Sequence, residues 1–183
     1  MKKKALLLIL IIISISAIIF HTNKPKQIYG NDNTSILQWI KDYDMRIKDS
    51  DSNITIAGIE DTGDIRIVGY LKSNSVGMVA YHRNSKNNYE MYDNIRIGTT
   101  ETSSFIAHYP AKGIDKIKYV VVSTGKDDIA MAELTVNEKY KQAKKIPLNK
   151  PSVIVFDLDL PQEEYKSMSF DCQFFDSDVN EIE

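Results

Sequence analysis

The feature that most constrains the fold is an alternation of apolar with polar or small residues that begins near residue 53. Ile65, Ile67 and Leu71 share one face of an expected strand, and Val68 and Tyr70 share the other. Successive side chains of a β-strand point to opposite faces, so this period of two predicts strands and not helices.

Turn-forming clusters rich in Asp, Asn, Ser and Gly separate these short segments. Residues 119–122 are apolar on both faces, which is typical of a central strand, and Pro110 is expected to end its strand. The pattern predicts a mainly β, antiparallel sandwich-like domain. The expected strands are 54–56, 65–71, 76–83, 89–97, 104–109, 119–122, 130–136, a basic strand ending at Pro147, 153–160 and 167–175.

One short amphipathic helix is expected before the strands, over residues 35–48. Ser35 and Gln38 have the spacing of a capping box, in which a hydroxyl accepts from a first-turn amide. The apolar residues that follow lie on one helical stripe: Ile36, Ile40, Tyr43 and Ile47.

The N-terminus has the pattern of a membrane segment. Three lysines at 2–4 precede an apolar run over residues 5–20, which only Ser14 and Ser16 interrupt. A cleaved secretory signal and an uncleaved transmembrane anchor both fit this pattern, and the continuation through Phe20 favours the anchor. We therefore expect a signal anchor over 1–23, a linker over 24–34 and an extracytoplasmic β-rich domain over 35–183. The lysine bias predicts that the N-terminus stays inside a cell membrane that the chain crosses once.

Charge and cysteine content narrow the function classes. The formal net charge is -2, from 23 basic and 25 acidic residues, which gives no electrostatic reason to expect nucleic acid. Cys172 is the single cysteine, so an internal disulfide and a cysteine-based zinc cluster are excluded. The alternation of Cys172 with Met168, Phe170 and Phe174 predicts a buried, unreactive thiol.

One stretch resembles an EF-hand calcium loop. Asp49, Asp51, Asn53 and Glu60 fall at positions one, three, five and twelve, and the Thr55 carbonyl would complete the ligands. Position six is Ile54 where the sharp turn requires Gly, and a strand follows instead of a helix. We therefore interpret the stretch as a solvated loop and expect no metal and no cofactor.

Other charged residues have simpler interpretations. Asp157 and Asp159 would share the wet face of a strand, although paired carboxylates can also hydrolyse a glycoside. The lysines at 139, 141, 144, 145 and 150 would form a charged edge hairpin, or would face an anionic envelope polymer. Residues 176–183 are expected to be a frayed acidic tail.

These observations predict a membrane-tethered, extracytoplasmic binding or accessory domain without catalysis. Its partners would be the membrane, through residues 5–20, and an envelope polymer or a membrane protein. One alternative is a glycan-acting surface enzyme that uses Asp157 and Asp159. Another is a scaffold or sensor subunit of a membrane complex, with Ser14 and Ser16 as polar contacts of the anchor.

Overall fold

The computed structural model describes residues 28–46, 53–73, 75–98, 100–111 and 114–182. This part of the chain is mainly β, with antiparallel sheets and a single α-helix, as the sequence predicts. The elements are α2 (Asn33–Arg46), β1 (Ile54–Thr62), β2 (Ile65–Lys72), β3 (Ser75–Arg83), β4 (Tyr89–Ile97), β5 (Thr102–Ala111), β6 (Ile114–Ser123), β7 (Met131–Val136), β8 (Tyr140–Lys145), β9 (Ser152–Asp157), the 3-10 helix η1 (Gln162–Lys166), β10 (Phe170–Phe175) and β11 (Glu181–Ile182).

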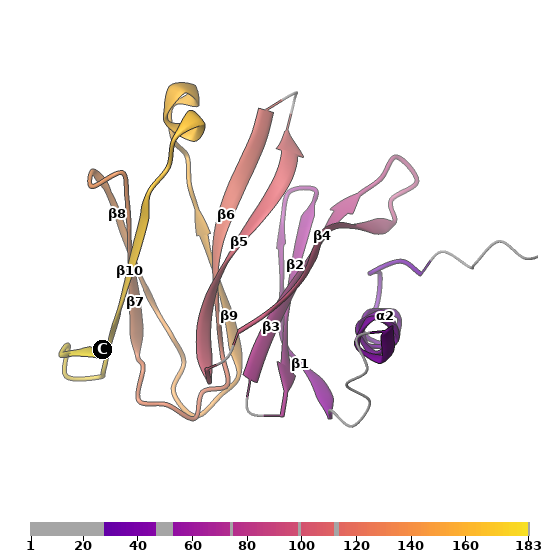
Figure 1. The fold of residues 1–183 in the computed structure, drawn as a ribbon, viewed down its shortest axis with the longest axis horizontal. Coiled ribbons are helices and arrows are strands. Elements are labelled where there is room, and N and C mark those ends of the chain that lie inside the picture. The colour runs from indigo at the N-terminus through magenta and orange to yellow at the C-terminus, as the bar shows by residue number, and fades with distance from the viewer. Residues whose placement is uncertain (1–27, 47–52, 74, 99, 112–113, 183) are drawn as a thin grey trace, which may run out of the picture.

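The strands form three sheets that lie side by side as layers, with α2 outside the first (Figure 1). The first sheet has the order β1-β2-β3-β4, the middle sheet β5-β6-β9 and the last sheet β11-β10-β7-β8. Every pairing is antiparallel. Each layer therefore covers an apolar face of its neighbour.

The middle sheet is buried on both faces, and β6 shows how its sequence achieves this. Val120 and Val122 pack toward the first sheet, whereas Tyr119 and Val121 pack toward the last sheet. The expectation of a central strand at 119–122 is confirmed, because β6 lies between β5 and β9.

Close approach of the first and middle sheets requires a glycine in β2. A Cβ atom at Gly69 would lie 2.3 Å from Val153 Cγ2 and 2.9 Å from Val122 Cγ1, both of which are side chains of the middle sheet. The neighbouring positions Ile65 and Ile67 fill the same interface with full side chains. Gly69 thus makes room for the opposing valines.

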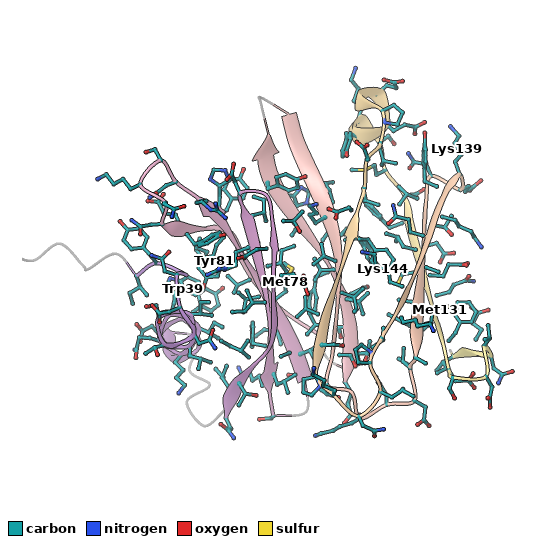
Figure 2. The ribbon with its side chains drawn as sticks, turned by 180° about the vertical axis from the view of Figure 1, so that it is seen from behind. Trp39, Met78, Tyr81, Met131, Lys139 and Lys144 are labelled. Atoms are coloured by element: carbon teal, nitrogen blue, oxygen red, sulfur yellow. The ribbon has the colours of Figure 1, made fainter. Side chains whose placement is uncertain are left out.

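The amphipathic helix packs on the outer face of the first sheet. Ile36 and Ile40 are fully buried there against a cluster that includes Val68, Val79 and Tyr81. Figure 2 shows Trp39 and Tyr81 on this side of the molecule and Met78 closer to the middle sheet. The predicted stripe is confirmed for Ile36, Ile40 and Tyr43, and Ile47 lies outside the described residues.

The expected helix cap was wrong by one turn. Asp32, inside the predicted linker, accepts from the Ser35 amide at 2.9 Å and from the Ser35 hydroxyl at 2.9 Å. A carboxylate at this position satisfies a first-turn amide, so the helix begins at Asn33 and Ser35 lies within its first turn. Gln38 does not reach back to a cap but donates to Asp42 at 2.7 Å. The hydrogen bonds from Ser35 also lower the pKa of Asp32.

Two strand ends also differ from expectation. β5 continues through Pro110 to Ala111, because β5 is an edge strand, where proline can replace an outward N–H without breaking a ladder bond. The tail is not frayed, since β11 pairs with β10. The Asp176 carboxylate accepts from the amides of Asp178 and Asn180 at 2.9 and 2.8 Å, and this closes the intervening turn.

The predicted membrane anchor, residues 5–20, lies outside the described residues. Among the helices that are described, none combines the length and apolar character needed to cross a membrane.

Candidate functional site

An open groove of about 930 Å³ lies beside β5. All three sheets or their connections contribute to it, and β5 lies between the contributions of the first and last sheets. Its lining side chains are uncharged at neutral pH and combine hydroxyls with apolar and aromatic groups. The lining residues are Ile97, Gly98, Thr100, Thr102, Ser103, Ser104, Phe105, Ile106, Tyr119, Phe170 and Phe174.

Hydroxyl groups organise one end of the groove. The Thr100 hydroxyl donates to the Thr102 carbonyl and lies 2.7 Å from the Ser103 hydroxyl. The Thr102 hydroxyl donates to the buried Ser123 hydroxyl at 2.7 Å, which connects β5 to β6. Gly98 permits close contact here, since a Cβ atom would lie 2.2 Å from Ser103 Oγ. The network holds this end of β5 in place.

Aromatic rings from the middle and last sheets form one wall of the groove. The rings of Tyr119 and Phe170 lie 5.5 Å apart between centroids, and Phe174 lines the same side. Burial raises the pKa of Tyr119 to about 12, so its hydroxyl is neutral at physiological pH. The wall therefore offers apolar rings without a charge.

Cys172 packs behind this wall but is only partly buried, which corrects the expectation of full burial. In the part of the chain that is described, β11 pairs with β10 only at Phe174 and Phe175, so Cys172 lies where β10 is itself an edge of the last sheet. Burial raises the pKa of the thiol to about 11, so the thiol is protonated at neutral pH and is a poor nucleophile.

A second polar cluster holds the chain where it enters the domain. Arg66 forms a bidentate pair with Asp61, with both distances 2.7 Å, and donates to the Gly30 and Asn31 carbonyls at 2.9 and 3.1 Å. The Arg66 guanidinium also lies 4.0 Å above the centroid of the Tyr89 ring. The pair lowers the pKa of Asp61. This cluster fixes residues 30–31 on the first sheet.

The residues that resemble a calcium loop are described only in part. Asp49 and Asp51 lie outside the described residues, Asn53 is exposed just before β1, and Glu60 is exposed within β1. Six residues of β1 separate Asn53 from Glu60, which places the two roughly 20 Å apart, whereas the ligands of an EF-hand loop converge on one ion. Among the described residues, no group of three or more His, Cys, Asp or Glu could hold a metal ion.

The two predicted carboxylates on the wet face have different surroundings. Asp157 is directly opposite Lys118 in the β6–β9 pairing and forms an ion pair with its ammonium group. Asp159 follows the end of β9 and is exposed. Phe156 and Leu158 are buried and alternate with these two carboxylates, but Val155, on the same face as Asp157, is buried as well, so the face is exposed only at its end.

Lys141, Lys144 and Lys145 lie on β8, at the edge of the last sheet, whereas Lys139 and Lys150 lie in the connections on either side of it. Lys141 pairs with Glu133 at 2.5 Å and Lys139 pairs with Glu164 at 3.3 Å. Lys144 donates to the Val155 carbonyl of β9 at 2.7 Å (Figure 2). Three of the five lysines thus have partners within the domain, which agrees with a charged edge hairpin.

Sequence reasoning missed both the groove and the Arg66 cluster. The groove residues run from Ile97 to Phe174, and no short motif marks residues that only the stacking of sheets brings together. The isolated Arg66 between Ile65 and Ile67 on a buried strand is the one local signal of the cluster.

A scan against protein-family models and searches of curated proteins and of solved structures found no match for this chain.

Proposed function

We propose that this protein is a membrane-tethered, extracytoplasmic domain that binds a ligand without catalysis. The observation that carries the proposal is the open, uncharged groove beside β5. Its size is in the range of ligand sites, and its combination of aromatic rings and hydroxyls suits recognition through apolar contacts and a few hydrogen bonds. The tether would hold this groove at the outer membrane surface, where an envelope polymer or a membrane protein is the natural partner.

Two features support the tether. The apolar run over residues 5–20 follows three lysines, which favours retention with the N-terminus inside. Arg66 then fixes Gly30 and Asn31, at the end of the predicted linker, to the first sheet. A force on the tether would therefore be transmitted to the β-rich domain through Gly30 and Asn31.

We further interpret the stacked layers as an extended β-sandwich. The first and middle sheets share one apolar core, and the middle and last sheets share a second. A sandwich of this kind offers its sheet edges and connections for binding, because both faces of its middle sheet are filled.

Topology is tested with reporters. An enzyme reporter that works only outside the cytoplasm, fused after Glu183, is expected to be active, and a cytoplasmic reporter at the same position is expected to be silent. The reverse pattern refutes the orientation. Release of the whole protein into the medium, with a new N-terminus near Ala17 or Ile18, refutes the anchor and supports a cleaved signal.

Binding is tested by photo-crosslinking in cells that make the protein. A photoreactive phenylalanine replaces Ile97, which lines the groove and is 41% exposed, or Leu148, which is also 41% exposed but lies in the connection between β8 and β9. We expect a discrete adduct from position 97 and none from position 148. The absence of an adduct from position 97, or equal adducts from both positions, contradicts the proposal.

A further inference from the structure

The groove contains an unpartnered strand edge. Thr124 donates to the Glu101 carbonyl at 2.8 Å, and the β5–β6 register runs without a bulge from that end to the other. Backbone groups alternate along an antiparallel strand, so odd-numbered residues of β5 face β6 and even-numbered residues face outward. Ser104 and Ile106 therefore direct their N–H and C=O groups into the groove.

No hydrogen bond within the described residues uses these outward groups of Ser104 and Ile106. Residues at both ends of β5 limit the length of edge that is open to hydrogen bonding. The Thr102 carbonyl is occupied by the Thr100 hydroxyl, and Pro110 lacks an N–H. Among the described residues, the open edge thus includes residues 103 to 107, which corresponds to ~15 Å of strand.

The opposite edge of the same sheet is treated differently. Even-numbered residues of β9 face β6, so Val155 and Asp157 face outward, and both of their carbonyls are covered. Lys144 donates to the Val155 carbonyl at 2.7 Å, and Gln142 donates to the Asp157 carbonyl at 2.9 Å. Proteins commonly protect edges in this way against unwanted pairing. The middle sheet is therefore capped at β9 and open at β5.

The walls of the open edge specify what it can accept. Ile97 and Phe105 lie on the side of the first sheet, whereas Ile106, Phe170 and Phe174 lie on the side of the last sheet. An added strand would direct alternate side chains toward these two walls. Because the lining carries no charge, the complementary side chains are uncharged and largely apolar.

We propose that the β5 edge binds an extended, uncharged segment of another protein as an additional strand of the middle sheet. This inference rests on the proposed binding function and names the class of its ligand. Alternating backbone donors and acceptors at strand spacing match a polypeptide. A second copy of this chain fits less well, because its own β5 lies between the same two walls and two such recessed edges cannot meet.

The test uses the full-length protein in detergent and random decapeptides displayed on phage. Peptides are selected on the wild type after binders of the Ser104→Pro variant have been removed. Proline at 104 removes an outward N–H and places a ring carbon at the edge, but it leaves the ladder to β6 intact. The matched control is Ser104→Ala, which keeps the N–H and removes only the hydroxyl. Thermal melts establish that both variants are folded.

Selected peptides are expected to be uncharged with alternating apolar residues. Their dissociation constants should rise at least tenfold with Ser104→Pro and change less than twofold with Ser104→Ala. Hydrogen exchange at the amides of Ser104 and Ile106 should slow at least tenfold when a peptide binds. The inference is overturned if no peptide is enriched, if both variants bind equally, or if protection appears elsewhere and not in β5.

The crosslinked adduct from position 97 separates this inference from the function on which it rests. An adduct that proteases degrade and that Ser104→Pro abolishes supports both. A protease-resistant adduct leaves the binding function in place and refutes the strand. An adduct that contains two copies of this chain also refutes it, because the partner would then be a second copy.

Discussion

Removal of the hydroxyl oxygen from Tyr81 and from Tyr89, two tyrosines of the first sheet, should change the stability of the domain in opposite directions. The Tyr81 hydroxyl is buried beneath α2, with the side chain 1% exposed, and has no hydrogen-bond partner within the described residues. The Tyr89 hydroxyl accepts from Arg83 at 2.7 Å and donates to the Asp61 carboxylate. We expect Tyr81→Phe to stabilise the domain and Tyr89→Phe to destabilise it.

The magnitudes follow from the hydrogen bonds. A buried hydroxyl without a partner costs about 1–3 kcal/mol of desolvation, and removal of the oxygen from Tyr81 should recover about 1–2 kcal/mol. Tyr89→Phe removes bonds to two charged groups and should cost about 1.5–3 kcal/mol. Burial also raises the pKa of Tyr81, and the positive charge of Arg66 offsets this effect only in part.

Fluorescence of Trp39 provides the assay, because it is the single tryptophan and lies on α2, stacked on Tyr43. For a chain of this size, 1 kcal/mol corresponds to about 2–4 °C in melting temperature. The Tyr81→Phe protein should melt about 2–8 °C higher than the wild type and the Tyr89→Phe protein lower. A lower melting temperature for Tyr81→Phe would refute the reasoning, because it would mean that the hydroxyl has a partner.

Three further predictions concern packing, pH and calcium. Gly69→Ala should cost about 1–3 kcal/mol by overpacking, whereas Gly58→Ala, with its nearest contact at 3.2 Å, should cost less; equal thermal melts contradict this. The Cys172 thiol ionises near pH 9 when unfolded and near 11 when folded, so its stabilisation is complete below pH 9 and declines as pH rises through 11. Cys172→Ala should therefore lose less melting temperature than the wild type between pH 9 and 11, and parallel curves argue against it. Calcium and chelator should give the same melting temperature within about 1 °C, and a rise that Glu60→Gln abolishes would establish the loop as a site.

The sequence predicted those parts of the fold that depend on local periodicity. The alternation of Ile65, Ile67 and Leu71 with Val68 and Tyr70 corresponds to the two faces of β2, one toward the middle sheet and one toward α2. Two apolar faces require two covering layers. The pattern therefore contained the information that β2 is covered on both sides, although it did not say by which elements.

What the sequence could not supply depends on long-range placement. Asp32 competes with Ser35 as helix cap, and only the position where the chain enters the first sheet decides between them. Pro110 ends a strand if its N–H would face a neighbour and not if it faces outward, so its effect depends on the register of β5. The groove requires residues as distant as Ile97 and Phe174 to meet, which follows from the order of the layers and not from any local pattern.

The two edges of the middle sheet differ in their protection, and a lysine of β8 contributes to this difference. Lys144 belongs to a basic segment that resembles a ligand site, yet its ammonium group donates to a backbone carbonyl of β9. A sheet with both edges capped would have no place for another strand, and one with both edges open would be prone to self-association. Capping at β9 alone leaves pairing possible only at β5. If this is the purpose of Lys144, then Lys144→Ala should promote self-association at high protein concentration, whereas Lys145→Ala, on the neighbouring exposed residue, should not. Sedimentation velocity would detect the difference in self-association. Identical behaviour of the two variants would show that Lys144 does not protect the edge at β9.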